Sequence, residues 1–399
     1  MQALAISHYT LSSALGVGID AQLSALREGR SGLGECHFDR GAELATYVGE
    51  VGGVDDASLP PALADFDCRN NRLAAIGLSA DGFDTAVSQA VQRYGSDRIG
   101  VYVGTSTAGI YQTELAYREL PENNDALPDW YNYAGTHNTY SIADFVRQFL
   151  GLQGPAAAIS TACSSSAKVF ASAHRAIAAG YCDAAVVGGV DSLCLTTLFG
   201  FHALQLVAED VCRPMDSERR GLSIGEAAGF ALLERDHDGT RMRLLGYGES
   251  GDAHHMSAPH PEGLGAIAAM QAALARAELA PGQVDYINLH GTGTAANDLA
   301  ESRAVSELFG TVTPCSSTKG FTGHTLGAAG IAEAVFCLLA MEHGFMPQSL
   351  HCRHLDPDIA CNVIRECRPA ALRHVLTNSF GFGGSNCSLL LGMNSAMGG

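Results

Sequence analysis

The sequence lacks an uninterrupted apolar run of the length that crosses a membrane. Its richest apolar stretch, residues 330–344, is interrupted by Glu333 and Glu342, whereas a spanning helix needs about 20 mainly apolar residues. The first ten residues, MQALAISHYT, also lack the basic segment that opens a secretory signal. We therefore expect a soluble protein located in the cytoplasm.

Closely spaced cysteine pairs are absent as well. The chain has 12 cysteines among 399 residues but no C-x-x-C pair. Cysteines scattered through a chain without an export signal are usually reduced and buried. We therefore expect neither disulfides nor a structural zinc site, and we expect most of the cysteines to fill the core.

Positive charge is scarce. The chain has 24 Lys and Arg residues against 42 Asp and Glu residues, a net charge of −18, and its only lysines are Lys168 and Lys319. This balance excludes nucleic acid as a partner, because phosphates require a basic face. An acidic protein partner would need a local arginine patch. Arg69 and Arg72, within CRNNR, are the predicted patch. Arg213, Arg219 and Arg220 are a second candidate, and solvated surface charge is the alternative for each.

The pattern that is present is that of an α/β protein, in which apolar β-branched runs alternate with alanine-rich helical stretches. The hydrophobic fraction of 47% is ample for a large core. Strands are predicted at Ile99–Val103, Ala156–Ser160, Ala184–Val187, Tyr286–Leu289 and His374–Thr377. Helices are predicted at Ala74–Arg93, Ser165–Ala179, Leu264–Ala277, Leu299–Phe309 and Ala328–His343. A polar segment, Glu234–Arg243, is the predicted boundary between two halves.

One cysteine has a distinctive setting. In AAAISTACSSSAK an apolar strand leads through Thr161 and Ala162 to Cys163, and small residues then open a helix. A helix N-terminus favours a thiolate, so this position predicts a nucleophile. The alternative is a buried structural cysteine. Lys168 follows one turn into the helix, where it either lowers the Cys163 pKa further or extends its ammonium toward solvent.

A histidine ends a second apolar strand. In YINLHGTGT the strand delivers His290 to its carboxyl end, the edge at which open α/β sheets bind ligands. Thr292 and Thr294 follow in a small-residue loop whose hydroxyls suit an extended polar chain. A structural role is the alternative for a single histidine.

A second histidine lies in the segment SSTKGFTGHTLGAAG. His324 sits at a glycine-flanked turn before a long helix that carries Glu333. Lys319 lies in an otherwise uncharged stretch, and a buried ammonium must be paired, so Glu333 is its predicted partner. The glycines have an alternative explanation in close helix packing.

A glycine-rich loop, NSFGFGGSN at 378–386, follows the last predicted strand. Its amides are suited to an oxyanion hole, and Phe380 and Phe382 are suited to gating a pocket. The alternative is a phosphate-cradling loop, but no Lys or Ser/Thr follows at Walker spacing. A nucleophilic cysteine, two histidines, a Lys–Glu pair and an amide-rich loop together indicate acyl transfer followed by stabilisation of an enolate.

With these motifs the sequence resembles the β-ketoacyl-acyl-carrier-protein synthases of the KAS I/II type, the elongating condensing enzymes of the thiolase superfamily. The resemblance covers essentially the whole chain in the family's order. It is carried by LREGRSG (26–32), TACSSS (161–166), CRPMDSERRGLSIGEAAG (212–229), HGTGT (290–294), STKGFTGHTLGAAG (317–330) and NSFGFGGSN (378–386).

This resemblance implies a thiolase-like five-layered αβαβα fold with two pseudo-symmetric halves, residues 1–245 with the nucleophile and residues 246–399 with both histidines. It implies a homodimer, or a heterodimer with a related ketosynthase-like subunit. Acyl carrier protein would be the partner that delivers substrates on its phosphopantetheine arm. No metal or organic cofactor is implied.

The resemblance also implies roles for individual residues. Cys163 would be acylated, and His290 and His324 would stabilise the enolate formed when malonyl-carrier protein loses CO2. Lys319 and Glu333 would support them. The backbone N–H groups of Cys163 and Phe382 would form the oxyanion hole. The residues implied to contact the pantetheine arm are Thr292, Thr294, Phe380 and Phe382.

The segment WYNYAGTHNTY at 130–140 departs from the family, which usually has an apolar acyl-pocket stretch there. Thr107, Tyr133 and His137 are the acyl-pocket candidates, and their aromatic character favours an unsaturated or aromatic acyl chain. Aromatic packing at a dimer interface is the alternative. The pathway stays open between fatty acid synthesis and a specialised route, aryl-polyene or type II polyketide synthesis with a chain-length-factor-like subunit.

Overall fold

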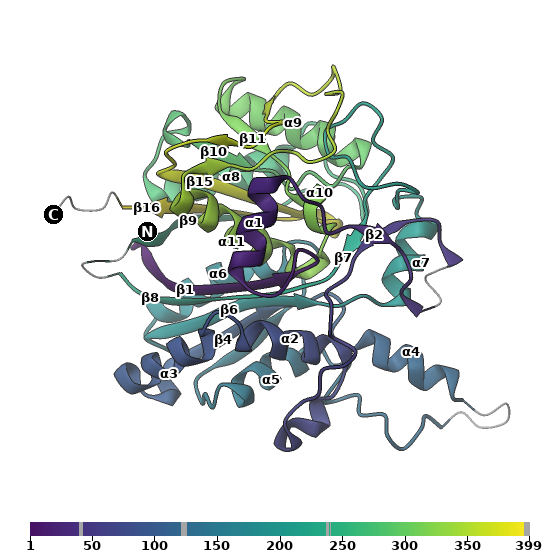
Figure 1. The fold of residues 1–399 in the computed structure, drawn as a ribbon. Coiled ribbons are helices and arrows are strands. Elements are labelled where there is room, and N and C mark those ends of the chain that lie inside the picture. The colour runs from purple at the N-terminus through teal and green to yellow at the C-terminus, as the bar shows by residue number, and fades with distance from the viewer. Residues whose placement is uncertain (40–42, 121–125, 237–238, 240, 395–399) are drawn as a thin grey trace.

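The computed structural model describes residues 1–39, 43–120, 126–236, 239 and 241–394. One 11-stranded sheet runs through the molecule (Figure 1). In spatial order its strands are β13 (Asn362–Val363), β11 (Pro314–Ser316), β10 (Tyr286–Asn288), β15 (His374–Gly381), β16 (Ser385–Met393), β9 (Met242–Gly251), β1 (Leu4–Ser13), β8 (Ala227–Arg235), β6 (Ala184–Asp191), β4 (Ile99–Gly104) and β5 (Ala156–Ile159).

This sheet consists of two similar parts. In one part β4 is parallel to β5 and β6, and β8 is antiparallel to β6 and β1. In the other part β10 is parallel to β11 and β15, and β16 is antiparallel to β15 and β9. The parts meet where Leu4 and Ala5 of β1 pair with Leu244 and Arg243 of β9. The repeated order and direction of strands show the pseudo-symmetry of the fold.

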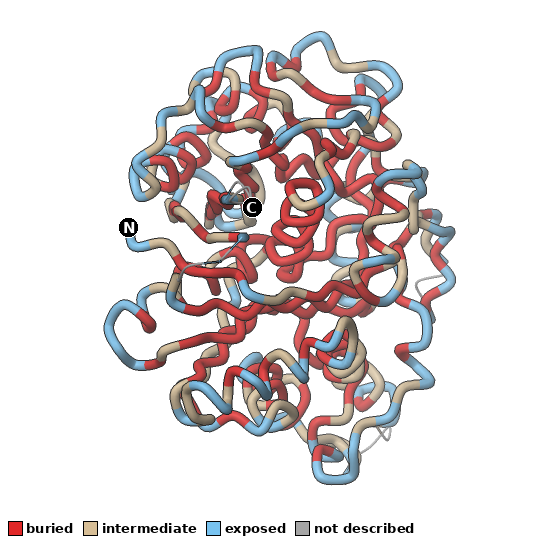
Figure 2. The backbone as a smooth tube through the Cα atoms, turned by 60° about the vertical axis from the view of Figure 1, so that its left-hand side comes forward, coloured by how far each residue is buried: buried red, intermediate tan, exposed pale blue. Residues whose placement is uncertain are grey.

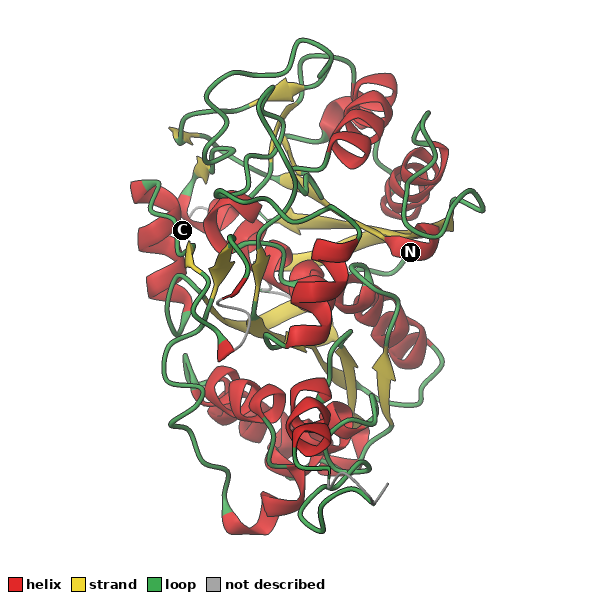
Figure 3. Ribbon diagram, turned by 90° about the vertical axis from the view of Figure 1, so that its right-hand side faces the viewer, coloured by secondary structure: helices red, strands yellow, loops and turns green. Residues whose placement is uncertain are grey.

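Helices lie in three layers around the two parts of the sheet (Figures 1 and 3). The outer layer of the first part contains α2 (Arg69–Ser79), α3 (Phe83–Tyr94) and α5 (Ser141–Phe149). The outer layer of the second part contains α8 (Leu264–Ala277) and α9 (Ala295–Phe309). Between the two parts lie α6 (Ser165–Ala178) and α11 (Ala329–His343). The predicted five-layered αβαβα fold is confirmed.

Shorter elements complete the described chain. They are α1 (Ile19–Glu28), β2 (Gly34–Glu35), β3 (Tyr47–Gly49), a 3-10 turn Pro61–Phe66, a 3-10 turn Ser96–Arg98, α4 (Ile110–Arg118), α7 (Leu195–Ala203), β7 (Ile224–Gly225), a 3-10 turn Pro281–Gln283, α10 (Lys319–Thr322), a 3-10 turn Leu326–Ala328, β12 (Phe345–Met346), β14 (Arg368–Pro369) and a 3-10 turn Phe382–Gly384.

The central helix α11 is mainly apolar, with Glu333 as its one buried charged residue, because it has no face toward solvent before its last turn. Its residues from Ala329 to Met341 are buried, and Figure 2 shows the middle of the molecule as buried. By length and composition the stretch Leu326–His343 would suffice to cross a membrane, but 89% of it is buried inside the fold. Gly330 lets α11 approach α6, since a Cβ at this position would lie 2.4 Å from the Ala167 backbone nitrogen.

The predicted helix Ala74–Arg93 is wrong in one respect, because two helices, α2 and α3, occupy this region. The break lies at Asp81 and Gly82, whose φ angles of 55° and 68° are left-handed. The Asp81 carboxylate accepts hydrogen bonds from the Ile19 N–H at 3.1 Å and the Thr10 hydroxyl at 2.7 Å. These contacts fix the chain at the break, which helical periodicity alone does not reveal.

The predicted boundary between the halves falls where the chain passes from β8 to β9. Residues 237, 238 and 240 of this segment lie outside the described residues. Strand β9 begins at Met242 and pairs with β16 of the second part, so residue 245 falls inside a strand.

Candidate active site

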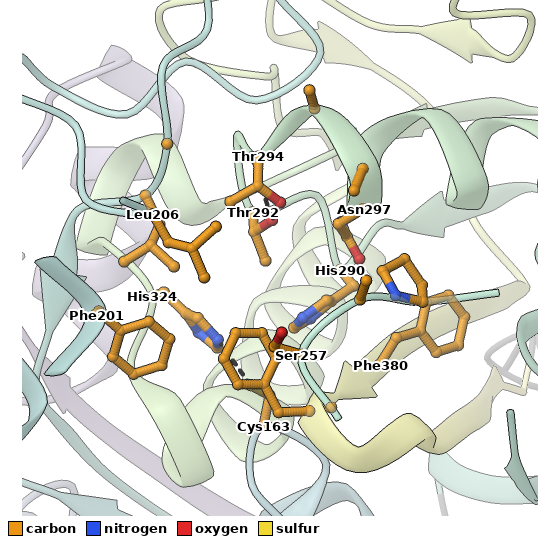
Figure 4. Close-up of a pocket in the computed structure, with 18 of the residues that line it drawn as sticks. Cys163, Phe201, Leu206, Ser257, His290, Thr292, Thr294, Asn297, His324 and Phe380 are labelled. Carbon is orange, nitrogen blue, oxygen red and sulfur yellow. Dashed lines mark hydrogen bonds between the residues drawn. The ribbon is translucent and has the colours of Figure 1, made fainter. Parts of the chain in front are cut away.

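A cavity of about 370 Å³ lies between residues of both halves, and Cys163, His290 and His324 line it (Figure 4). Its volume is within the range of small-molecule sites. The other lining residues are Phe201, Gln205, Leu206, Arg219, Arg220, Gly221, Leu222, Asp252, Ser257, Ala258, Pro259, Thr292, Thr294, Ala295, Ala296, Asn297, Phe380, Gly381, Phe382 and Asn386. The predicted nucleophile and both predicted histidines therefore share one cavity.

Cys163 is held by a tight turn between β5 and α6. Ala162 has a left-handed φ of 52°. The Thr161 N–H donates to the Ser165 hydroxyl at 2.9 Å, and that hydroxyl donates to the Ala162 carbonyl at 2.6 Å. The Ser165 hydroxyl thus satisfies two backbone groups of the turn that presents Cys163.

The rings of the two histidines lie beside the Cys163 side chain. His324 Nε2 lies 3.0 Å from Cys163 Sγ. The His290 and His324 rings are 5.3 Å apart between centroids and nearly perpendicular, at 82°. Figure 4 shows both imidazoles pointing into the cavity beside Cys163. A thioester carbonyl held here would meet two ring nitrogens.

Lys319 is buried behind His290. Its ammonium donates to the His290 carbonyl at 2.5 Å, to His290 Nδ1 at 3.3 Å, and to Glu333. An ammonium has no lone pair, so Nδ1 must accept and the ring proton must sit on Nε2. The pair Lys319–Glu333 therefore selects the tautomer in which His290 directs an N–H into the cavity.

Burial sets the protonation of the site. Desolvation lowers the pKa values of His290 and His324 well below 6.5, and the charge of Lys319 lowers both further. Both imidazoles are therefore neutral at pH 7. Desolvation raises the pKa of the Cys163 thiol to about 11. We expected the helix N-terminus to favour a thiolate, but loss of solvent outweighs it and the resting group is a thiol.

Two backbone amides face the nucleophile. The N–H groups of Phe382 and Cys163 hydrogen-bond the Cys163 sulfur, and each lowers its pKa. Phe382 is at the tip of the hairpin between β15 and β16, where Gly383 and Gly384 have left-handed φ angles of 75° and 71°. The glycines allow the turn that aims the Phe382 amide at the sulfur.

The predicted pantetheine contacts lie along the same cavity. Thr292 and Thr294 line it, with their hydroxyl oxygens 2.9 Å apart. Phe380 and Phe382 line it as well, and the Phe382 ring lies 5.4 Å from that of Phe201 between centroids. An extended polar chain entering here would pass hydroxyls on one side and aromatic rings on the other.

Glu301 is a residue of the site that the motifs did not reveal. Its carboxyl group accepts hydrogen bonds from the N–H groups of His290 and Gly291, both at 2.8 Å, and from the Asn378 amide at 3.2 Å. Burial raises its pKa to about 7. On sequence alone a single glutamate in helix α9 is indistinguishable from a surface residue.

Asp191 is a second such residue. It accepts the N–H groups of Ser106 and Thr107 and the Thr107 hydroxyl, all within 3.0 Å, and the Gly327 N–H at 2.5 Å. It thus ties the loop after β4 to the turn that follows His324. Asp191 ends strand β6. Its position at the carboxyl end of a strand is the feature of the sequence from which a role in the site could have been predicted.

The acyl-pocket candidates lie outside this cavity. Thr107 directs its hydroxyl to Asp191 at 2.8 Å. Tyr133 is 57% exposed, and His137 Nδ1 is held 2.7 Å from the Thr113 hydroxyl. The structure of the single chain therefore does not place Thr107, Tyr133 or His137 around Cys163.

The predicted docking patch at Arg69 and Arg72 is corrected. Arg69 is 4% exposed, and its guanidinium binds Glu226 at 2.8 Å and Glu50 at 3.2 Å. Arg72 is half-buried and donates from Nε and Nη2 to the two carboxylate oxygens of Asp67, at 2.6 and 2.7 Å. These charges are already neutralised within the fold, so they do not form a free basic surface.

The cavity's donor atoms are also of the types that bind zinc. One atom each of Cys163, His290 and His324 lie within 4.8 Å of one another, and nitrogen and sulfur ligands suit Zn²⁺. The ammonium of Lys319, 3.3 Å from His290 Nδ1, opposes a second positive charge at this place. The charge of Lys319 therefore disfavours a cation at these three atoms.

Comparisons with known proteins find one family along most of the chain. The sequence profile of the β-ketoacyl synthase N-terminal domain matches residues 4–239, and that of the C-terminal domain matches residues 242–353. The chain is 33% identical to nodulation protein E of Rhizobium sp. (strain N33), over 94% of this chain and 95% of the relative. It is 32% identical to 3-oxoacyl-[acyl-carrier-protein] synthase 2 of Staphylococcus aureus, over 74% and 77%.

A solved structure is similar over nearly the whole fold. The ketosynthase ApeO from Xenorhabdus doucetiae, in complex with its chain length factor ApeC, gives a TM-score of 0.88 at 37% identity. The match covers 98% of each chain.

Proposed function

Because the chain belongs to the β-ketoacyl synthase family, we propose that its condensing chemistry runs through Cys163, His290 and His324. The protein is an acyl-transferring condensing enzyme, a 3-oxoacyl-acyl-carrier-protein synthase. The observation that carries the assignment of residues is the cavity in which both neutral imidazoles and two backbone amides converge on one sulfur.

The first half-reaction moves an acyl group to Cys163. His324, 3.0 Å away, accepts the thiol proton as the sulfur attacks the acyl thioester. The amides of Cys163 and Phe382 stabilise the tetrahedral oxyanion. The carbon–sulfur bond to the carrier breaks, and the departing pantetheine thiolate takes the proton from His324. The enzyme is left as a neutral acyl thioester.

The second half-reaction forms the carbon–carbon bond. Once Cys163 is acylated no thiol proton faces His324, and the ring proton moves through solvent from Nδ1, which has no hydrogen-bond partner in the described chain, to Nε2. Malonyl-carrier protein enters, and the Nε2–H groups of His290 and His324 bind its thioester oxygen. Loss of CO2 leaves the carbon–carbon electron pair as an enolate, whose charge these two donors stabilise. The enolate carbon attacks the acyl carbon on Cys163, the carbon–sulfur bond breaks, and a 3-oxoacyl-carrier protein leaves. The Cys163 thiolate then recovers a proton from solvent.

One substitution tests these roles. Cys163→Gln places a neutral amide where the acyl thioester would be, so condensation should be abolished while decarboxylation of malonyl-carrier protein rises. Mass spectrometry of the carrier proteins follows both reactions, through 3-oxoacyl- and acetyl-carrier protein respectively. Condensation that survives in this variant would disprove the role of Cys163.

We propose that the carrier protein docks at Arg220. This arginine is exposed at the cavity mouth, and within the described chain it forms no ion pair. An acidic carrier needs such a contact because the enzyme carries a net charge of −18. Arg220→Glu should raise KM for the carrier at low salt, with a smaller effect at high salt.

The control is Arg373→Glu, which makes the same charge change at an exposed arginine outside the cavity. An equal rise in KM in both variants would show that net charge, rather than Arg220, governs association.

A second candidate is a ketosynthase of a specialised pathway, paired with a chain-length-factor-like subunit. The 98% overlap with a ketosynthase solved with its chain length factor favours it. Strand β5 is the last strand of the sheet and its residues are half-buried, which leaves one edge for another subunit. Native mass spectrometry of the chain, alone and co-expressed with such a subunit, tests it. A stable and active homodimer would contradict the heterodimer.

We propose that this specialised enzyme prefers polyene over saturated acyl chains. Trp130, Tyr133 and Tyr140 are exposed by 44%, 57% and 41% in the single chain, so a partner subunit would cover aromatic surface here. Turnover of polyene and saturated acyl-carrier substrates, measured side by side, tests the preference. Equal or better use of the saturated chain would contradict it. We also propose a cytoplasmic location and no metal or organic cofactor.

A further inference from the structure

One of the two lysines has no part in the chemistry described above. Lys168 is in the first turn of α6, the helix that follows Cys163. Its ammonium donates to the Ser385 hydroxyl at 2.7 Å and forms no ion pair within the described chain. A cation near a helix N-terminus opposes the helix dipole. Helix electrostatics therefore do not account for this lysine, and its observed contact is the bond to Ser385.

Ser385 closes the hairpin whose tip carries the Phe382 amide. Gly381 of β15 pairs with Ser385 of β16, and the three residues between them form the tip. The hairpin base rests on the nucleophile turn, since a Cβ at Gly381 would lie 3.2 Å from the Cys163 backbone nitrogen. A hydrogen bond to Ser385 therefore acts at the base of the oxyanion hole.

The tip is also tied to the loop after β9. The Gly383 N–H donates to the Met256 carbonyl at 2.8 Å, and the Asp252 N–H donates to the Gly384 carbonyl at 3.0 Å. Both ties hold the tip to the second half of the chain. The bond from Lys168 instead joins the base of the hairpin to α6, the helix that follows Cys163.

We propose that Lys168 is a positioning residue that holds the Phe382 and Cys163 amides in register by fastening the β15–β16 hairpin to α6. This inference rests on the proposed function, because it concerns the oxyanion hole of that site. Direct activation of the thiol by Lys168 is a different role. The Lys168 ammonium bonds the Ser385 hydroxyl rather than the Cys163 sulfur, so Lys168 acts through the position of the hairpin.

Loss of the Lys168 contact should affect two reactions of the same site differently. Acyl transfer passes through a tetrahedral oxyanion that needs both amides, whereas malonyl decarboxylation relies on the two histidines. Lys168→Met keeps the hydrocarbon chain and removes the donor. Losing one oxyanion donor typically costs 100-fold or more, so misplacing one should slow acyl transfer at least about 10-fold while decarboxylation changes less than about twofold.

The experiment compares rapid-quench rates of acyl transfer from acyl-carrier protein in four proteins: wild type, Lys168→Met, Ser385→Ala and the double variant. Decarboxylation is measured with and without Lys168→Met in the Cys163→Gln background. Acyl transfer should be slower in both single variants than in the wild type. The double variant should be no slower than either single variant. Lys168→Arg and Ser385→Thr, which keep a donor and an acceptor, should restore most of the rate.

An unchanged rate of acyl transfer in Lys168→Met would overturn the proposal. A loss of decarboxylation as large as the loss of acyl transfer would overturn it as well. So would a normal Ser385→Ala beside an impaired Lys168→Met, which would point to charge rather than contact. If Lys168→Met does not fold, Ser385→Ala and Ser385→Thr decide the question. Absence of acyl transfer to Cys163 in the wild type would instead refute the proposed function itself.

Discussion

His324 Nε2 lies 3.0 Å from Cys163 Sγ although 161 positions separate the two residues in the chain. Cys163 follows a strand of the first part of the sheet, and His324 lies before the central helix of the second half. The reactive pair therefore exists only when the two halves pack. The contact between α6 and α11 at Ala167 and Gly330 is close to both residues in sequence and sets that packing.

The first prediction concerns this packing. Gly330→Ala places a methyl group 2.4 Å from the Ala167 nitrogen, so the helices must separate. Overpacking of this kind costs about 1–3 kcal/mol, and the shift should also reduce condensation. Thermal unfolding and a condensation assay measure both effects. Gly282→Ala is the control, because its Cβ would meet nothing within 4 Å; equal behaviour of the two variants would contradict the role of the helix contact.

Substitution of each of the two histidines should affect acyl transfer and decarboxylation differently. His324→Ala removes the group beside Cys163 and one enolate donor, so acyl transfer and decarboxylation should both fall, each about 100-fold. His290→Ala removes an enolate donor only, so decarboxylation should fall by a similar factor while acyl transfer persists. Single-turnover acylation and CO2 release separate the two reactions. Loss of acyl transfer in His290→Ala comparable to that in His324→Ala would argue against this division.

The buried carboxyl of Glu301 predicts a pH dependence of stability. Its pKa is raised from 4.5 to about 7, so between these values the folded chain holds a proton that the unfolded chain releases. This contribution to stability is present below pH 4.5 and is lost as pH rises to about 7. Glu301→Gln removes it, so the variant's deficit in melting temperature should be larger at pH 5 than at pH 8.

The matched control for that measurement is Glu307→Gln, an exposed change on the same helix. Its melting temperature should follow the wild type across the range. A deficit of Glu301→Gln that is constant from pH 5 to pH 8 would show that the carboxyl group does not titrate in this window.

Removal of metal should leave condensation unchanged. The sulfur and nitrogen atoms of Cys163, His290 and His324 are close enough to share an ion, but the proposed steps use only proton transfer and hydrogen bonding. Dialysis against a chelator, followed by elemental analysis and assay, measures this directly. Activity that disappears with the metal and returns with added zinc would contradict the mechanism.

The sequence was sufficient for those parts of the site that depend on local structure. A strand, a small-residue turn and a helix start place Cys163, and a strand end places His290. The pairing of Lys319 with Glu333 followed from the cost of burying a lone ammonium. The αβαβα fold and the family were also predicted, because their motifs lie in order along the chain.

Features set by distant partners were not predictable in the same way. Arg69 seemed free for docking because its partner Glu226 lies 157 positions away. The break between α2 and α3 depends on contacts of Asp81 with β1 and α1. The Cys163 thiol is neutral because the surrounding fold excludes water, an effect that helix position does not report.

The most direct test is to identify the acylated residue. The wild-type protein is incubated with acyl-carrier protein without malonyl-carrier protein, and the intact mass and digested peptides are measured. We predict one added acyl group, on the peptide that contains Cys163, and its loss as 3-oxoacyl-carrier protein when malonyl-carrier protein is added. An acyl group on any of the other 11 cysteines, or none at all, would contradict the account.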